Sequence, residues 1–339
     1  MGKVTMQDLA DAARVSRITV WKALNNRPGV SEEMRLEIQR KAAELKYSAS
    51  AAIPVKAAAD RTFSIVVSRP ESSSFWMQII HHIAKELAIH GINMMYTYMP
   101  TSYHEGYTLP SSLNAESVDG FIVLNVYNEN LLRLLTAQPL PKVFLDTVPS
   151  MAPQDLNGDL VILEGRARVC EITTKLLASG RKKLGFIGDV NYAKTNFDRY
   201  QGFLDAHRSQ HIAVDPALCM TGPIGLRSHF EEISQFLSGL STLPDAFVCP
   251  SDFIAHFISR YFTETGRKIP EGFVLTGFDN NPEYANIAGQ ITTVNVETAM
   301  LGKSLARKLM FHADYPDAPY EVTYVATNIL YRGGLGNAS

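Results

Sequence analysis

Short apolar runs alternate with longer amphipathic stretches along most of this chain, and this alternation limits the folds available to it. The apolar runs are 63–67, 92–98, 118–124, 142–145, 160–163, 184–188, 246–249 and 273–277. The amphipathic stretches between most of them are 75–90, 128–137, 165–179, 199–210, 226–239 and 252–266. One strand and one helix in every ~25–35 residues is typical of right-handed βαβ crossovers and a parallel sheet. Because about 270 residues exceed one comfortable domain, we predict two similar α/β lobes.

The first 47 residues follow a different pattern, that of three short helices. The predicted helices begin after Thr5, Ser16 and Ser31, whose hydroxyls can cap a helix N-terminus. The second helix is expected to run to about Asn25 and the third to Tyr47. Residues 48–60 are small, Ala-rich and interrupted by Pro54, which indicates a linker or hinge.

Charge is divided unevenly between this head and the rest of the chain. Residues 1–56 hold ten Lys/Arg and six Asp/Glu, whereas residues 57–339 hold twenty-two and twenty-eight. A basic terminal module on an acidic body is typical of a nucleic-acid-binding head. The net charge of −2 excludes a wholly basic coat for polyanions.

Several function classes find no support in the sequence. Three scattered cysteines without a CxxC pair favour a reduced compartment over a disulfide framework or a zinc site. The chain has neither an export signal nor an apolar run of ~18 residues, so we expect a cytoplasmic protein without a membrane segment. It also lacks GxSxG, P-loop, HExxH and strand-following GxGxxG motifs. We therefore expect no enzyme, no cofactor and no metal.

The second predicted helix has two contrasting faces. Val20, Ala23 and Leu24 share an apolar face suited to packing on the first helix. The opposite face carries Arg17, Ile18, Trp21, Lys22 and Asn25. Arg and Lys can bond guanine in a DNA major groove, and Ile can contact a thymine methyl group. The alternative is a small three-helix cap with a solvated face, which would leave two apolar groups exposed beside two cations.

At this point the chain resembles the lactose-repressor/purine-repressor family of bacterial transcription regulators. The family pattern V-T-x-x-D-[VL]-A-x-x-A-x-V-S-x-x-T-V is matched by Val4, Thr5, Asp8, Leu9, Ala10, Ala13, Val15, Ser16, Thr19 and Val20. The resemblance implies a helix-turn-helix head in which Arg17, Ile18 and Lys22 read bases. It further implies that Thr5, Ser16, Thr19 and Asn25 hold phosphates or turn geometry, and we add Ser31 to the DNA-binding candidates.

Two head residues depart from the family pattern. Arg14 stands at a turn that usually carries Gly, where a left-handed backbone would cost about 1 kcal/mol and a phosphate contact could offset it. Trp21 replaces a small polar residue. Its ring could lie over sugar-phosphate or cover the edge of the second helix.

The linker departs further from the family. The family continues Y-x-P-x-x-x-A-R-x-L and folds there into a hinge helix whose Leu enters the minor groove. This chain instead has Pro54 and Lys56 where Arg and Leu are usual, and an internal proline opposes a helix. We favour an extended linker in which Ile53 or Val55 is a weaker wedge and Lys56 contacts phosphate. A shifted helix that begins at Pro54 is the alternative.

The body resembles the periplasmic sugar-binding-protein fold, with a ligand cleft between two lobes. On this resemblance the N-lobe comprises about 61–162 and 294–322, the C-lobe about 163–293 and 323–333, and 334–339 form a tail. The predicted effector residues are Phe75, Trp76, Asn125, Asp146, Arg199, Ser251, Asp252 and Asp279. Most follow a strand or begin a helix, and planar carboxylate and guanidinium groups suit vicinal hydroxyls.

Each of these assignments has a structural alternative. The polar residues could be helix caps or surface ion pairs, and the rings of Phe75 and Trp76 could belong to the core. The stretch near residue 223, where many relatives carry a pocket aromatic, reads Thr-Gly-Pro-Ile-Gly here. Arg69 and Glu71 could make the pocket more polar.

The sequence thus predicts an all-α helix-turn-helix head and an α/β body of two doubly wound parallel-sheet lobes with a cleft. We expect a homodimer that binds a near-palindromic operator in double-stranded DNA and a small effector, most simply a sugar. It would be nucleoid-associated when bound to operator. A nucleoside or purine-type effector is the alternative, and a sugar receptor for transport or a hydrolase is a more distant rival.

Overall fold

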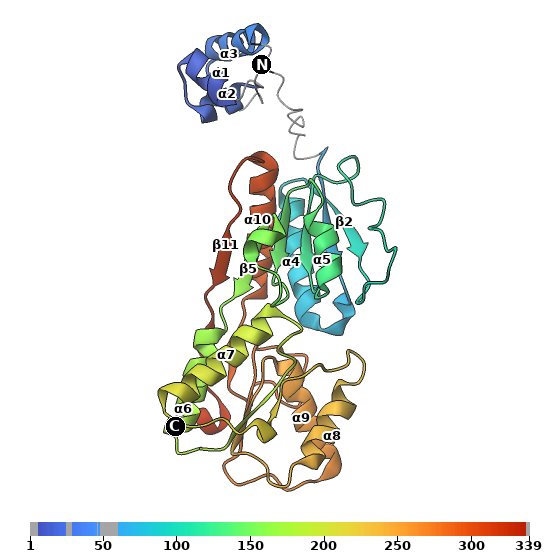
Figure 1. The fold of residues 1–339 in the computed structure, drawn as a ribbon, viewed down its shortest axis with the longest axis vertical. Helices are drawn as coiled ribbons and strands as arrows, with labels where there is room; N and C mark the ends of the chain where they lie inside the picture. Colours follow the sequence, from blue (N-terminus) through green and yellow to red (C-terminus); the bar gives the residue numbers. More distant parts are fainter. Residues whose placement is uncertain (1–5, 25–28, 46, 48–59, 337–339) are drawn as a thin grey trace. The chain divides into compact units, whose positions relative to one another are not determined.

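A computed structural model describes residues 6–24, 29–45, 47 and 60–336 of the chain. It divides into two compact units, a head formed by residues 1–60 and a body formed by residues 61–339 (Figure 1). The predicted contact residues Thr5, Asn25, Ile53, Val55 and Lys56 lie outside the described residues, as does Pro54. The extended linker therefore stays a prediction.

The head consists of three short helices around a small apolar core. These are α1 (Met6–Ala13), α2 (Arg17–Leu24) and α3 (Glu32–Glu44). Leu9, Ala10, Val20, Ala23 and Ile38 are fully buried between them. Two of the three predicted caps are confirmed, since Ser16 Oγ accepts from Thr19 N at 3.1 Å and Ser31 Oγ from Met34 N at 3.3 Å. The third, Thr5, lies outside the described residues. The third helix is shorter than predicted because it ends before Tyr47, whose side chain packs on the core.

The turn between α1 and α2 is left-handed at Arg14. Its φ is +56°, as expected for a position that usually carries glycine. The turn is closed by a hydrogen bond of 3.0 Å from Val15 N to Ala10 O. A left-handed backbone at a residue with a side chain costs roughly 1–2 kcal/mol. The contacts of the turn therefore hold Arg14 in a conformation that arginine disfavours.

The N-lobe of the body is a six-stranded sheet whose neighbouring strands are all parallel. In spatial order the strands are β11 (Val322–Val325), β5 (Asp159–Leu163), β4 (Lys142–Leu145), β3 (Gly120–Leu124), β1 (Thr62–Val67) and β2 (Asn93–Tyr98). Helices α4 (Ser74–Ile89) and α10 (Thr298–Asp314) cover one face, and α5 (Glu129–Thr136) covers the other. Successive residues such as Ile65 and Val66 accordingly enter different core clusters.

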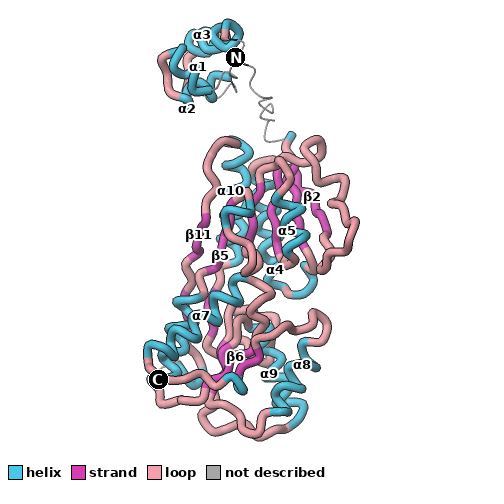
Figure 2. Tube along the Cα trace, in the orientation of Figure 1, coloured by secondary structure: helices cyan, strands magenta, loops and turns pink. Residues whose placement is uncertain are grey.

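The C-lobe repeats this three-layer arrangement on a smaller sheet. Its parallel strands, in spatial order, are β7 (Cys219–Met220), β6 (Leu184–Ile187), β8 (Ala246–Val248) and β9 (Val274–Thr276). Helices α6 (Arg166–Ala178) and α7 (Lys194–Ser209) pack on one face, and α8 (His229–Gly239) and α9 (Asp252–Thr265) on the other. The predicted fold class, two doubly wound lobes, is confirmed (Figure 2).

The chain passes between the lobes three times. It crosses after β5, again between β10 (Thr293–Asn295) and α10, and a third time between β11 and β12 (Asn328–Leu330). β10 and β12 pair antiparallel, and Glu164 N donates to Val325 O at 3.0 Å. The lobe boundaries given above stay a prediction. The N-lobe sheet extends past them to Leu163 and to Val325.

All eight predicted apolar runs contain strands, but the last part of the body was not foreseen. α7 begins five residues before the predicted 199, and α10, β10, β11 and β12 have no counterpart in the predicted alternation. None of the described helices is long and apolar enough to cross a lipid bilayer.

Candidate functional site

The strands of both lobes end at one cleft, and four residues just after strands have strained backbones there. β1 leads to Arg69, β3 to Asn125 and β4 to Asp146, while β9 leads to Asp279 from the other lobe. Their φ angles are +45°, +54°, +69° and +105°, in the left-handed region that non-glycine residues avoid. Such strain persists where surrounding contacts enforce it, and it is frequent at ligand sites.

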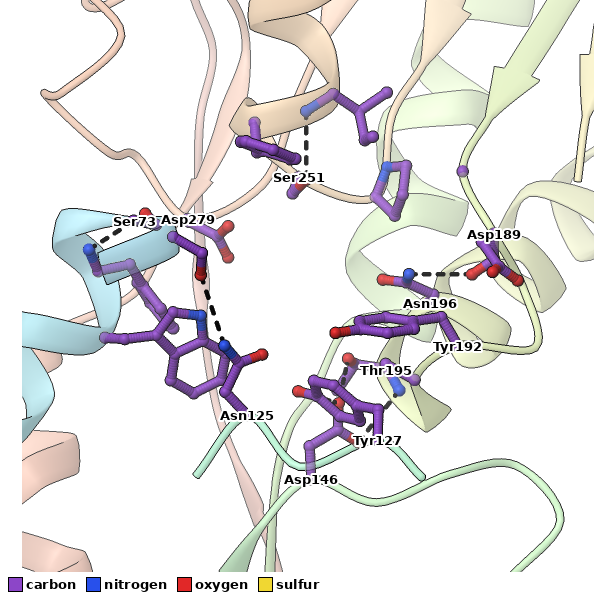
Figure 3. A pocket seen from close by; sticks show the side chains of 18 of the residues that line it. Ser73, Asn125, Tyr127, Asp146, Asp189, Tyr192, Thr195, Asn196, Ser251 and Asp279 are labelled. Carbon is purple, nitrogen blue, oxygen red and sulfur yellow. Dashed lines mark hydrogen bonds between the residues drawn. The ribbon is translucent and has the colours of Figure 1, made fainter. Parts of the chain in front are cut away.

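A cavity of about 180 Å³ lies between these strand ends. Seven of the eight predicted effector residues line it: Phe75, Trp76, Asn125, Asp146, Arg199, Ser251 and Asp279. The polar and aromatic lining residues that sequence reasoning missed are Ser72, Ser73, Tyr127, Asp189, Tyr192, Thr195, Asn196, His229, Phe253 and Tyr284. Figure 3 shows Tyr127 and Asp146 facing the C-lobe residues Tyr192 and Thr195.

Asp146 joins the lobes at the floor of this cavity. Its Oδ1 accepts from Thr147 N at 2.8 Å and from Thr195 N at 3.3 Å, and its Oδ2 accepts from Thr195 Oγ1 at 2.5 Å and Tyr127 OH at 3.2 Å. Burial raises the pKa of Asp146, although these bonds and Arg199 oppose the rise. Because two carboxylate oxygens offer about four acceptor sites, Asp146 has little capacity left for a ligand.

Arg199 is buried against the C-lobe but retains free donors. Its Nη1 donates to Pro250 O, and Cζ lies 3.5 Å from the centroid of the Phe278 ring. Among the described residues no other guanidinium nitrogen of Arg199 has a hydrogen-bond partner. Burial lowers the pKa of Arg199, and the nearby Asp279 and Asp146 oppose this effect. The unused part of the guanidinium fork is therefore available to a bound molecule.

Asp279 is the second available group. No described residue donates a hydrogen bond to its carboxyl group, although Arg199 lies close enough to stabilise its charge. Burial raises the pKa of Asp279 to about 8, against the opposing effect of Arg199 and with a smaller contribution from Asp252. Asp279 can thus present a carboxylic acid or a carboxylate to a ligand near neutral pH.

Asp252 does not reach the cavity, contrary to the expectation for the effector site. Its Oδ2 accepts from Asn281 N at 2.8 Å and its Oδ1 from Thr293 Oγ1 at 2.7 Å. Burial raises the pKa of Asp252 to about 6. Because it sits in the first turn of α9 and turns away from the cleft, it positions the loop that carries Asp279.

Ser251 and Asn125 line the cavity while they also serve the local fold. Ser251 Oγ caps α9 through Ile254 N at 3.4 Å. Asn125 Nδ2 donates to Ser68 O at 2.8 Å and to Arg69 O at 3.3 Å, which holds the turn after β1. Ser251 therefore both caps a helix and lines the cavity, and Asn125 both holds a turn and lines the cavity.

Rings surround the cavity from both lobes. Phe75 and Trp76, in the first turn of α4, contact the N-lobe core and line the cavity, with centroids 5.3 Å apart. In the stretch near residue 223, where the sequence has no aromatic residue, Ile224 and Leu226 line the cavity. Tyr127 and Tyr192 pair instead across the lobes, with ring centroids 4.7 Å apart. Both follow a strand by a few residues, the signal that could have identified them.

The head presents α2 as its candidate DNA interface. Val20 and Ala23 face the core, and the side chains of Trp21 and Lys22 are half-buried on the remaining surface. Thr19 Oγ1 lies 2.9 Å from Ser16 Oγ, within the cap. The side chains of Arg17 and Ile18 lie outside the described part of the chain. The assignment of these residues to DNA contacts stays a prediction.

Comparison with known proteins assigns both units. Residues 5–50 match the family model described as bacterial regulatory proteins, lacI family, and residues 173–334 match a periplasmic binding protein-like domain. The chain thus combines a lacI-type DNA-binding domain with a periplasmic-binding-protein-like domain. This combination is that of a DNA-binding transcription regulator, and the similar proteins are transcriptional repressors rather than enzymes.

Similarity to known repressors extends along nearly the whole chain. It is 26% identical over 332 residues to the HTH-type transcriptional repressor PurR of Mannheimia succiniciproducens, covering 97% of each protein. It is 25% identical over 317 residues to the PurR of Haemophilus influenzae, covering 92% of each. The transcriptional regulator CelR in complex with cellobiose superposes with a TM-score of 0.68 at 22% identity, covering 98% of this chain and 100% of that one. A Lac repressor dimer bound to operator and the anti-inducer ONPF gives 0.67 at 19%, covering 98% and 99%.

Proposed function

We propose that this regulator is a lacI-family repressor that binds a near-palindromic operator as a homodimer, with one α2 in each half-site. The relatives named PurR are repressors by name, and the similar Lac repressor structure is a dimer on operator. Two-fold symmetry of a dimer matches the symmetry of a palindromic site. The protein would work in the cytoplasm and lie on the nucleoid when bound to operator.

We further propose that the cleft binds an uncharged polyhydroxylated effector, a sugar or sugar derivative. The observation that carries this proposal is the pair of available groups, Arg199 and Asp279, in a cavity walled by rings. A guanidinium fork donates to two neighbouring hydroxyls, and a protonated carboxyl group donates to one hydroxyl and accepts from another. Rings such as Trp76 cover the apolar face of a sugar. The volume, about 180 Å³, is below the roughly 300–1,000 Å³ of drug-sized pockets and suits a single ring.

The charge of the cavity supports an uncharged ligand. Arg69 and Arg199 bring two positive charges, and Asp146 and Asp189 bring two negative charges. Asp279, with a pKa near 8, is largely protonated at pH 7. Because these charges cancel, a phosphate or carboxylate group would enter without a surplus cation to receive it.

A purine-type effector is the second candidate. The relatives named PurR favour it, and a planar base could stack between rings of the two lobes. The two candidates differ in what they require of the site, because a base is read by its edge whereas a sugar is read by hydroxyl pairs.

A calorimetric screen of the full-length protein separates these candidates. The panel contains free pentoses and hexoses, their phosphates, nucleosides and purine bases. We expect a neutral sugar to bind and its phosphate to bind at least tenfold more weakly. Binding by a purine base, with no sugar bound, would establish the second candidate instead.

Operator release and a matched variant complete the test. The sugar that binds should change the affinity for operator, and Arg199→Ala should abolish its binding while operator binding without sugar persists. Arg260→Ala is the control, because Arg260 is an exposed C-lobe arginine paired with Glu264 at 2.6 Å. Equal loss in both variants would mean that the sugar binds outside the cavity.

A further inference from the structure

A carboxylate of the C-lobe binds the first turn of an N-lobe helix beside the cleft. Glu283 lies in the loop after β9, and its Oε2 accepts from Ser74 N at 2.8 Å and from Ser73 Oγ at 3.2 Å. Ser73 and Ser74 begin α4, the helix that carries Phe75 and Trp76 into the cavity. Because the first N–H groups of a helix lack internal partners and carry partial positive charge, a carboxylate is favoured at this position.

Neighbouring residues of the same loop strengthen this contact between the lobes. Asn281 Nδ2 donates to Ser73 Oγ at 2.9 Å and to Glu283 Oε2 at 3.2 Å, while Ser74 Oγ donates to Asn281 Oδ1 at 3.0 Å. Tyr284 OH lies 3.3 Å from Ser73 Oγ. One loop of the C-lobe therefore holds one helix start of the N-lobe through several hydrogen bonds.

Neither lobe needs this contact to keep its own fold. Ser73 Oγ also accepts from Phe75 N at 3.2 Å, which caps α4 from within the N-lobe. The C-lobe loop is anchored by Asp252, which accepts from Asn281 N at 2.8 Å. Breaking the Glu283 contact therefore leaves a capped helix and an anchored loop, so it weakens the connection between the lobes without unfolding either.

A second carboxylate bridges the lobes in the opposite direction, but its burial differs. Asp146 of the N-lobe accepts from Thr195 N, in the first turn of α7 of the C-lobe, and α7 has no side-chain cap at Ala193. Asp146 and Thr195 are 6% and 8% exposed, whereas Glu283 is exposed. Water can replace the donors of an exposed carboxylate, whereas a buried one loses its partners without compensation. We therefore expect the lobes to part at the Glu283 contact rather than at the Asp146 contact.

We propose that Glu283 is a latch that holds the cleft closed when it is empty, and that its release from Ser73 and Ser74 lets the lobes part. The role of release in effector entry rests on the proposed function of the cleft. The latch itself does not, because the contact joins the lobes whatever molecule the cleft binds.

Distances between spin labels on the two lobes test the latch without a ligand. Labels at Thr101 and Ser241, both exposed, report lobe separation in full-length protein whose three cysteines have been replaced by serine. Glu283→Ala should shift the distances to longer values, with Glu283→Gln intermediate. Loss of a helix-capping acceptor corresponds to a shift of roughly twofold to thirtyfold in the ratio of open to closed molecules.

A matched control and an independent probe keep the test decisive. Glu271→Ala removes an exposed C-lobe carboxylate that precedes β9, and it should leave the distances unchanged. In a Trp21→Phe background Trp76 is the single remaining tryptophan, and Glu283→Ala should make it more accessible to acrylamide. Unchanged distances in Glu283→Ala would overturn the latch. Greater quenching without longer distances would also overturn it, because only the start of α4 would then have loosened.

The kinetics of effector binding test whether the latch controls entry to the cleft. With a sugar identified by the screen, Glu283→Ala should raise both its association and its dissociation rate constants, whereas Glu271→Ala should change neither. If no sugar binds, the proposed effector class fails while the distance result still stands. If a sugar binds with unchanged rates in Glu283→Ala, the latch does not control entry.

Discussion

The guanidinium of Arg199 lies over the ring of Phe278, with Cζ 3.5 Å from the ring centroid. This stack fixes the plane of the fork while Nη1 is bonded to Pro250 O, so the direction of the remaining donors is set before any ligand arrives. Preorganised donors lose little entropy on binding, which is what a selective polar site requires.

Arg199→Lys should therefore weaken effector binding by about tenfold or more, although the charge is kept. Lysine lacks both the planar fork and the stack over an aromatic ring. Calorimetry with the identified effector measures the change. Arg260→Lys is the matched control, because Arg260 also lies over a ring, that of Phe230 at 3.9 Å, on the exposed side of α9. Wild-type affinity in Arg199→Lys would show that the fork does not contact the ligand.

The stability of the body should fall as pH rises through neutrality because of Asp279. Burial raises its pKa to about 8, whereas an aspartate in an unfolded chain titrates near 4. Between about pH 4 and 8 the folded protein binds the extra proton, so the free energy of unfolding decreases with increasing pH. Asp279→Asn should flatten this decline and raise the melting temperature at pH 8 by about 2–4 °C.

Melting curves from pH 5 to pH 8.5 measure that slope. Asp317→Asn, at an exposed carboxylate, should reproduce the wild-type profile. The assignment to Asp279 is wrong if Asp279→Asn and the wild type lose stability in parallel over this range.

Two glycines in helices offer a comparison of packing. A Cβ at Gly202 of α7 would lie 2.1 Å from the carbonyl oxygen of Arg166 in α6, whereas a Cβ at Gly239 of α8 would meet nothing within 4 Å. Gly202→Ala should destabilise the body by about 1–3 kcal/mol through overpacking. Gly239→Ala should be neutral or slightly stabilising, and denaturant unfolding of both variants measures the difference. Equal stabilities would mean that α6 and α7 can move apart at no cost.

Operator recognition should depend on α2. We expect Arg17→Ala and Lys22→Ala each to weaken specific operator binding by about 1–3 kcal/mol. Fluorescence anisotropy on a selected operator and on random DNA gives the ratio of affinities. Arg40→Ala is the control, because Arg40 is an exposed head cation paired with Glu44 on α3. An unchanged ratio in both α2 variants would remove this helix from base reading.

The linker should bend the operator less than the linker of other family members does. Pro54 and Lys56 oppose a hinge helix with an apolar wedge, so the central base pairs should be little deformed. We expect changes of the two central base pairs to alter affinity by less than about 1 kcal/mol, below the usual ~1–3 for a mismatch. Gel-shift bend analysis with a centre-mutated operator series measures both effects. A sharp central kink with strong base preference would show that the linker inserts, through Ile53 or Val55.

The sequence predicts those parts of the fold in which local pattern and tertiary role agree. Most strands from β1 to β9 are apolar over both faces because helices cover both sides, so each appears as a continuous run. The exceptions are the two-residue β7 and the edge strand β2, most of which is exposed. β11 lies at a sheet edge and its residues Val322 and Tyr324 are exposed, so its sequence carries no such signal. α10 was missed because the expected alternation of strand and helix had already ended.

The cavity was predicted in part for a related reason. Strand-end position identified Asp146 and Asp279, and an expected helix start identified Arg199, which lies one turn inside α7. Position does not tell where a side chain points. Asp252 also follows a strand, yet it bonds to Asn281 and Thr293 and leaves the cavity. The sequence could not separate these cases, because it does not show that Asp146 and Asp279 have left-handed backbones whereas Asp252 lies in the first turn of α9.

The three chain crossings between the lobes limit how the body can move. Glu164 bonds to Val325 O and accepts from Thr327 Oγ1 at 3.0 Å, and Asn295 pairs with Asn328, so the crossings are tied to one another. Three connecting segments of backbone resist sliding of one lobe past the other. They still allow one lobe to rotate against the other about an axis through the crossings. Effector and operator should therefore communicate through a single rotational coordinate, and a substitution at any one crossing should alter the response to both.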